Sequence, residues 1–146
     1  MKKRYVIAGT GSRGLNMFCK PLVFDETLSE FSKIAALYDT STERMKYVKT
    51  VLAKDDLPCY TDWDRLCSEI DFDALIVASR DSTHAEIIKK GLVENKRVFS
   101  EKPLCTDAEQ VNEIIKAERA SEEEVFVTHN MRYGPAITKM KAVIEE

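Results

Sequence analysis

Proline and glycine are scarce in this 146-residue chain, with four and five residues respectively. No apolar run approaches the roughly 20 residues that span a bilayer. Hydrophobic residues make up 44% of the sequence and charged residues 32%, and no segment is of low complexity. This composition is that of a globular protein and excludes disordered and membrane-spanning proteins. We expect one globular domain with no membrane partner.

Cysteine and histidine are too few and too scattered to form a metal site. Only two histidines are present, and no Cys-x-x-Cys pair occurs among the four cysteines, Cys19, Cys59, Cys67 and Cys105. We therefore expect no bound metal and four reduced thiols, which indicates a cytoplasmic protein. The net charge of −3 is spread over residues of both signs, so nucleic acid is not an expected partner.

Short apolar segments alternate with helical patterns along the chain. We expect strands at residues 5–8, 34–38, 59–60, 74–78, 97–100 and 125–128. Between and after them we expect helices at 13–19, 40–52, 63–70 and 83–94, then from 106 and from 135. This order predicts an α/β fold of the Rossmann type, a doubly wound parallel sheet with helices on both faces.

Helix ends are also marked in the sequence. Thr40 with Glu43, and Thr106 with Glu109, have the spacing of a capping box, so both threonines are expected to be N-caps. Pro21 is expected to disturb the end of the first helix. Ligands of such sheets bind at the carboxyl ends of the strands, so the residues after each strand are the candidates for function.

A glycine-rich motif follows the first expected strand. Residues 9–14 have the sequence Gly-Thr-Gly-Ser-Arg-Gly, a G-x-G-x-x-G pattern that opens a helix. In this context Gly9 permits a tight turn, Gly11 lets the backbone approach a pyrophosphate, and Gly14 lets the helix pack on the strand. A turn without a ligand is the alternative, but the strand–helix context favours a dinucleotide. The expected cofactor contacts are Gly9, Thr10, Gly11, Ser12, Arg13 and Gly14.

Asp39 ends the second expected strand, where an acidic residue in NAD-binding folds meets the adenosine ribose hydroxyls. It could instead help to cap the next helix, but Thr40 is already available as a cap. A carboxylate here repels a 2′-phosphate, so NAD is the expected cofactor. Arg44, one turn into the helix, leaves NADP as the less favoured option.

Two further motifs carry a family resemblance. Glu101-Lys102-Pro103 follows the fifth strand, and Asn130-x-Arg132-Tyr133-x-Pro135 follows the last. With the glycine motif and Asp39, they make the whole chain resemble the Gfo/Idh/MocA family of dehydrogenases. The resemblance implies that Glu101 lies at the cofactor and that Lys102 reaches the nicotinamide ribose and the substrate. It also implies a peptide bond before Pro103 that is often cis. A lysine in an exposed turn is the structural alternative for Lys102.

The segment 79–84 matches a family loop that usually has the sequence Thr-Pro-Asn-x-x-His. Arg80 replaces the proline and Asp81 replaces the asparagine. The resemblance places Ser79, Asp81 and His84 beside the cofactor, although a purely structural histidine at a helix start is equally compatible with the pattern. Neither His84 nor His129 is expected to be the catalytic base, and His129 is expected to be structural.

Asn130 and Arg132 are expected either on the substrate side or as anchors of a linker. The helix at about 135–146 is expected to begin the link to a C-terminal substrate domain, which in the family supplies the acid–base histidine. The resemblance implies a homo-oligomeric parent protein that moves a hydride between a sugar or polyol and nicotinamide. This chain, residues 1–146, would bind the dinucleotide without catalysing turnover. An NAD-dependent glycosidase and a non-enzymatic module that senses NAD or a sugar are the alternatives.

Overall fold

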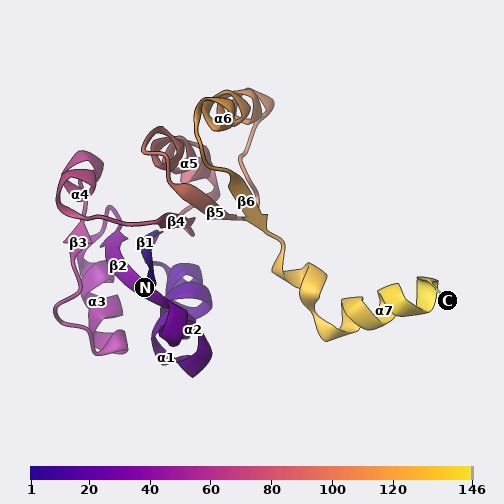
Figure 1. Ribbon diagram of the computed structural model, residues 1–146, viewed down its shortest axis with the longest axis horizontal. Helices are drawn as coiled ribbons and strands as arrows, with labels where there is room; N and C mark the ends of the chain where they lie inside the picture. Colours follow the sequence, from indigo (N-terminus) through magenta and orange to yellow (C-terminus); the bar gives the residue numbers. More distant parts are fainter. Residues whose placement is uncertain (146) are drawn as a thin grey trace.

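The computed structural model describes residues 1–145 and contains one six-stranded parallel sheet, in the order β3-β2-β1-β4-β5-β6 (Figure 1). The strands are β1 (Lys3–Ala8), β2 (Ser32–Tyr38), β3 (Cys59–Tyr60), β4 (Ala74–Val77), β5 (Arg97–Glu101) and β6 (Val125–Thr128). The Rossmann-type fold and all six expected strands are confirmed. The strand order reverses direction beside β1, so the switch point of the sheet lies between β1 and β4.

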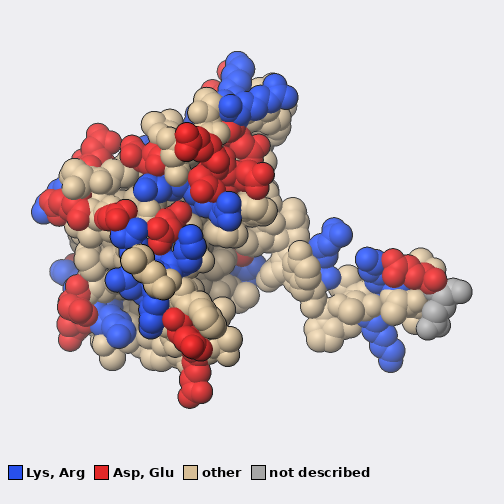
Figure 2. Space-filling model, viewed as in Figure 1, with Lys and Arg blue, Asp and Glu red and all other residues tan. Residues whose placement is uncertain are grey.

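Helices cover both faces of the sheet. They are η1 (Gly14–Cys19), α1 (Lys20–Phe24), α2 (Glu26–Phe31), α3 (Thr42–Leu52), α4 (Trp63–Glu69), η2 (Asp81–Thr83), α5 (His84–Val93), α6 (Ala108–Ala120), η3 (Asn130–Tyr133) and α7 (Pro135–Glu145). Among the described residues, no helix is both long and apolar enough to cross a membrane. Figure 2 shows acidic and basic side chains intermixed over the visible face.

The core forms two layers because side chains alternate along each strand. Val6 and Ala8 of β1 pack in a cluster with residues of α4, α5 and α6. Ile7, which lies between them, packs in a second cluster with residues of η1 and α3. Each face of the sheet is therefore closed by helices, and the carboxyl ends of the strands remain available for a site.

The first helix differs from the prediction. The segment Gly14–Cys19 is a π-helix, and the chain continues into α1 instead of ending near Pro21. Pro21 lies in the first turn of α1, where a residue without an N–H is tolerated because that group needs no helical partner. A proline near the end of one helical segment can therefore begin the next.

Both predicted caps are wrong by one residue. Ser41, not Thr40, caps α3 by accepting a hydrogen bond from the Arg44 N–H at 3.3 Å. Asp107, not Thr106, caps α6 in the same way, with Gln110 as donor at 2.9 Å. Each cap is the residue with extended backbone directly before the first helical residue, which is the conformation that an N-cap requires.

The helix α7 extends away from the rest of the domain (Figure 1). Its apolar side chains Ile137, Met140, Val143 and Ile144 are exposed. A helix is thus confirmed at the predicted position.

An ion pair joins the start of β1 to the segment before β4. Arg4 donates to Asp73 from its backbone N–H at 2.8 Å and from Nη2 at 2.9 Å. These side-chain and backbone hydrogen bonds lower the pKa of Asp73 to about 2. Because that value lies below the roughly 3.9 of an unfolded aspartate, the pair stabilises the fold above about pH 4. The stabilisation is lost as the pH falls through about 2.

Asp73→Asn is expected to lower the free energy of unfolding by about 1 kcal/mol at pH 7, because the pair is partly screened by solvent. The difference from wild type should shrink as the pH falls toward 2, which denaturant titrations across that range would measure. Asp71→Asn is the matched control, because Asp71 contacts the same guanidinium but its side chain is 75% exposed. Equal losses in the two variants at pH 7 would contradict the prediction.

Candidate cofactor site

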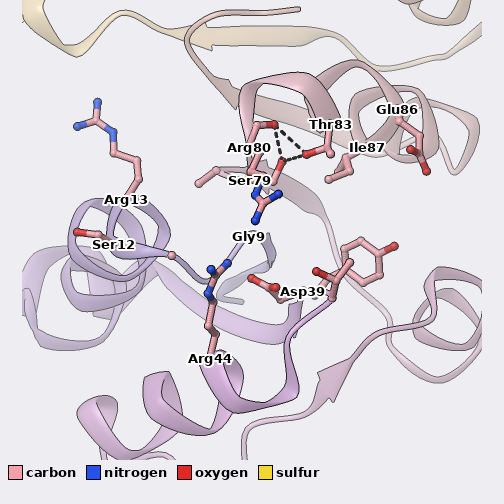
Figure 3. Close-up of a pocket in the computed structure, with 14 residues that line it drawn as sticks. Gly9, Ser12, Arg13, Asp39, Arg44, Ser79, Arg80, Thr83, Glu86 and Ile87 are labelled. Carbon is pink, nitrogen blue, oxygen red and sulfur yellow. Dashed lines mark hydrogen bonds between the residues drawn. The ribbon is translucent and has the colours of Figure 1, made fainter.

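A cavity of about 530 Å³ lies at the carboxyl ends of β1, β2 and β4 (Figure 3). Its volume is within the roughly 300–1,000 Å³ of small-molecule sites. The predicted site residues that line it are Gly9, Gly11, Ser12, Arg13, Asp39 and Ser79. Residues not predicted as contacts complete the lining: Tyr38, Thr40, Arg44, Ala78, Arg80, Thr83, Glu86 and Ile87. The cavity therefore sits at the switch point of the sheet, where ligands of this architecture bind.

The three glycines of the 9–14 loop have different surroundings. Gly9 has a φ of +96°, and a Cβ there would overlap the backbone of Ser79. A Cβ on Gly14 would overlap the carbonyl oxygen of Gly9. Gly11, in contrast, has nothing within 4 Å of an added Cβ. Gly9 and Gly14 are thus required by packing, whereas the missing side chain of Gly11 leaves open space at the cavity wall.

Asp39 is held between the glycine loop and the start of α3. Its Oδ2 accepts hydrogen bonds from the backbone N–H of Thr10 at 2.7 Å and from the Thr10 hydroxyl at 2.6 Å. Its Oδ1 accepts one from the Ser41 N–H at 2.9 Å. A carboxylate has about four acceptor positions, so one position on Oδ1 remains for a ligand hydroxyl. Asp39 is only 8% exposed, and its remaining acceptor lies at the cavity.

The ionisation of Asp39 follows from these contacts. Burial raises its pKa, but the hydrogen bonds from Thr10 and Ser41 and the charge of Arg44 outweigh burial, so the pKa lies below its usual value. The carboxylate is therefore charged at neutral pH. Asp39 also orders the residues before α3 through Ser41, so the ribose and helix-start roles considered for it are compatible.

A second polar link joins the glycine loop to the β5 and β6 ends. Arg13 Nη2 contacts Glu101 Oε2 at 3.0 Å, and the Thr128 hydroxyl donates to Glu101 Oε1 at 3.1 Å. Glu101 is 4% exposed, so Arg13 supplies the positive charge that a buried carboxylate needs. Glu101 does not line the cavity. Within the described residues it contacts the cavity wall through Arg13.

His84 joins two of the loops at this edge. Its Nδ1 lies 2.7 Å from the Pro103 carbonyl oxygen, and its Nε2 lies 3.3 Å from that of Ser79. The side chain is 1% exposed and does not line the cavity. Both ring nitrogens thus lie within hydrogen-bond distance of backbone carbonyl oxygens, and a neutral imidazole can donate to one of them. This arrangement corresponds to the structural role considered for this histidine. The peptide bond between Lys102 and Pro103 is cis, as the resemblance implied.

Residues 3–129 match the Gfo/Idh/MocA family, described as an oxidoreductase family with an NAD-binding Rossmann fold. The chain belongs to this family. YteT of Bacillus subtilis, classed as an oxidoreductase without a named substrate, is 34% identical over 145 residues, which are 97% of this chain and 33% of YteT. An inositol 2-dehydrogenase from Gluconacetobacter diazotrophicus is 33% identical over 77% of this chain and 34% of its own length. The chain thus spans about a third of the length of these curated relatives.

Solved structures show the same fold. The myo-inositol dehydrogenase from Lactobacillus casei, in complex with NAD(H) and myo-inositol, has a TM-score of 0.86 at 24% identity. The match covers 99% of this chain and 42% of that enzyme. The WlbA dehydrogenase from Bordetella pertussis, in complex with NADH and UDP-GlcNAcA, also has a TM-score of 0.86, at 19% identity, and covers 99% and 42%.

Other predicted site residues of this Gfo/Idh/MocA domain lie outside the cavity lining. Lys102 follows β5 with an exposed side chain that forms no ion pair within residues 1–145. Asp81 is exposed in η2, and Asn130 and Arg132 are exposed in η3. His129, expected to be structural, is also exposed, and no hydrogen bond of its side chain occurs in the described part of the chain.

Sequence analysis missed the part of the cavity wall formed by the start of α5. Thr83, Glu86 and Ile87 line the cavity from the segment that follows β4. The Thr83 hydroxyl is 2.8 Å from that of Ser79 and donates to the Arg80 carbonyl at 2.8 Å (Figure 3). The signal was present, because Glu86 and Ile87 lie in the first turn of a helix that follows a buried strand.

Proposed function

We propose that this chain is the cofactor domain of an NAD-dependent dehydrogenase that acts on a sugar, polyol or related CH–OH substrate. The observation that carries the proposal is the cavity at the switch point, with Gly11 open toward it and the charged Asp39 in its wall. Inositol dehydrogenases among the relatives support the substrate class. We propose that residues 135–146 begin the link to a C-terminal substrate domain, because the relatives are about three times as long.

The residues present fit a dinucleotide. Residues 9–14 would face the pyrophosphate at the start of η1, with Gly11 giving access to the backbone, and the remaining acceptor of Asp39 would meet a ribose hydroxyl. Ser79, Asp81 and His84 would form the loop beside the dinucleotide, and Glu101 would act through Arg13. When bound, the nicotinamide supplies hydride transfer at the substrate carbon.

Lys102 is the proposed catalytic residue of this domain. Its exposed ammonium at the end of β5 would orient the substrate hydroxyl and favour the deprotonated oxygen as the carbon loses its hydride. Asn130 and Arg132, after β6, would lie on the substrate side or anchor the linker. The proposal includes a cytoplasmic, homo-oligomeric parent protein, and the four free cysteines support a reducing location.

The cofactor choice is testable through Asp39. Wild-type protein is expected to bind NADH more tightly than NADPH, because the carboxylate accepts a ribose hydroxyl and repels a 2′-phosphate. Asp39→Ser should weaken NADH binding by about 1.5–3 kcal/mol, or about 10- to 150-fold, and relax the discrimination. Titration calorimetry with both dinucleotides would measure these constants.

Thr10→Val is the matched control for that experiment. It removes the hydroxyl that donates to Asp39 but leaves the carboxylate and the Thr10 backbone donor in place. It should therefore retain the preference for NADH, and thermal unfolding of both variants would show that the domain is folded. Equal affinity of the wild type for NADH and NADPH would refute the role of Asp39, and binding of neither would refute the proposed function.

A further inference from the structure

Two buried polar side chains at this edge of the sheet do not line the cavity. Glu101 is 4% exposed and His84 is 1% exposed, and neither contributes to the cavity wall. A buried carboxylate with a cationic partner adds little net stability compared with apolar side chains of similar volume. The stability of the fold therefore does not account for a charged group at position 101. The place of the two residues suggests a reason, because Glu101 directly precedes Lys102 and His84 contacts the residue that follows it.

The segment before Lys102 is held by the glycine loop and by β6. Arg13 Nη2 donates to Glu101 Oε2 at 3.0 Å. The Thr128 hydroxyl, at the end of β6, lies 3.1 Å from Glu101 Oε1 and 3.2 Å from the Ser100 carbonyl oxygen. The Ser100 hydroxyl in turn donates to the Glu101 carbonyl at 3.0 Å. The last two residues of β5 are thus fixed through both their side chains and their backbone.

The segment after Lys102 is held from α5. The Pro103 carbonyl oxygen lies 2.7 Å from Nδ1 of His84, which is the first residue of α5. A neutral imidazole with its proton on Nδ1 donates this hydrogen bond. Ile88 of α5 packs in one buried cluster with Val98 of β5, so the imidazole comes from an element that is fixed against the same strand. The backbone on both sides of Lys102 is therefore held by buried groups.

The ammonium of Lys102 has no such support. Its side chain is exposed and forms no ion pair within residues 1–145. A lysine ammonium is a point charge on a flexible stem, so a fixed backbone is what limits the positions that it can reach. A group that orients a reacting hydroxyl must be held close to its productive geometry. The contacts on either side of Lys102 can provide this restraint.

We propose that Glu101 and His84 are positioning residues for Lys102, which fix the backbone of residues 101–103 between the glycine loop, β6 and α5. This inference rests on the proposed function, because it takes from it the contact of Lys102 with the nicotinamide end of the dinucleotide. The effect of Glu101 and His84 on the ligand passes through the lysine and not through a contact of their own.

The first test compares NADH with ADP, which has the adenosine and the pyrophosphate but no nicotinamide riboside. Lys102→Ala should weaken NADH binding about 3- to 10-fold, as expected for one lost hydrogen bond, and leave ADP binding unchanged. Glu101→Gln should reproduce this pattern, because glutamine offers one acceptor oxygen in place of two and so loses one of the two contacts. Adding Lys102→Ala to Glu101→Gln should increase the loss less than about twofold, since both changes act through the same ammonium. Titration calorimetry would measure all four proteins.

Conservative variants separate positioning from a general loss of structure. Thr128→Val should weaken NADH binding in the same selective way, and Thr128→Ser, which keeps the hydroxyl, should restore it. His84→Asn, whose amide can donate in place of Nδ1, should bind NADH more tightly than His84→Leu. Thr50→Val is the matched control, because the Thr50 hydroxyl donates to a carbonyl within α3 and does not line the cavity. It should leave both affinities unchanged.

Amide hydrogen exchange tests the restraint without any ligand. In Glu101→Gln, exchange of residues 100–104 should be about 10-fold faster than in the wild type, because a hydrogen bond that restrains this segment is lost, whereas Thr50→Val should leave it unchanged. Unchanged exchange in Glu101→Gln would overturn the positioning role whatever the ligand. Equal losses of NADH and ADP binding would also overturn it, since they would place the effect of Glu101 at Arg13 and the pyrophosphate, and the proposed function would stand. Failure of the wild type to bind any dinucleotide would instead refute the proposed function.

Discussion

Gly11→Val is expected to weaken NADH binding at least about 100-fold, equivalent to about 2.7 kcal/mol, while the domain remains folded. The reason lies in the geometry of this one position. A Cβ on Gly11 meets nothing within 4 Å in the protein, and Gly11 lines the cavity. The valine side chain would therefore project into ligand space without displacing protein atoms. Gly11 also lacks the positive φ that makes Gly9 intolerant of side chains.

The neighbouring glycines provide the contrast. A side chain on Gly9 or Gly14 would overlap backbone atoms, so variants there should lose stability as well as binding. Calorimetry with NADH and thermal unfolding would separate the two effects. Gly11→Ala should give a smaller loss of affinity, and Gly134→Ala, before α7 and outside the cavity, should give none. Unchanged NADH affinity in Gly11→Val would remove the glycine loop from the binding site.

The location of the cavity could be predicted from the sequence because each strand end carries its own signal. Gly9, Asp39 and Ser79 each stop an apolar run, and in a parallel sheet these ends meet at one edge. The pattern of apolar and polar residues thus sufficed for a parallel sheet of the Rossmann type and for six of the fourteen residues of the cavity wall.

The caps show where local patterns are ambiguous. Thr40 precedes Ser41, and Thr106 precedes Asp107, so two adjacent side chains could cap each helix. The cap is the residue whose backbone is extended at the point of entry, and that depends on how the preceding loop leaves the sheet. The spacing to Glu43 and to Glu109 favours the threonine of each pair, but it does not determine which backbone is extended.

Hydrogen bonds between residues far apart in the chain could not be predicted from the sequence. Thr10 with Asp39, Arg13 with Glu101, and His84 with Pro103 are separated by 29, 88 and 19 residues. Each pair joins two strand ends, and only the assembled sheet brings its members within hydrogen-bond distance. The sequence indicated that these residues lie near a ligand, but not that several of them hold one another in place.

The 146-residue chain is expected to bind NAD but to turn over no substrate. Lysines that act as bases are buried or lie beside another cation, whereas Lys102 is exposed. His84 is buried, and both of its ring nitrogens lie within hydrogen-bond distance of backbone carbonyl oxygens. His129 is exposed and outside the cavity lining. The described residues therefore offer Lys102 to orient a hydroxyl, but no group in position to take its proton.

The lack of groups that position a substrate is expected to limit catalysis more than the lack of a proton acceptor. Holding two reactants in a productive geometry can lower the activation barrier by roughly 7–11 kcal/mol. Such positioning requires protein groups on both sides of the substrate. Lys102, Asn130 and Arg132 are all exposed, so the described chain offers one open side of such a site. Without the opposite side, a sugar near the dinucleotide would have no fixed orientation. The proposed C-terminal substrate domain would supply that side.

The test is to incubate the chain with NAD and a panel of sugars, inositols and glycosides, and to follow NADH absorbance and release of the aglycone. We expect NADH binding by calorimetry and no product above the level of a protein-free reaction. Joining the remaining two thirds of a full-length relative to this chain should restore activity. That activity should be lost in Lys102→Ala, which removes the ammonium but does not alter the cavity wall. Sustained turnover by the 146-residue chain alone, lost in Lys102→Ala, would show that the active site is complete within it and would refute the two-domain proposal.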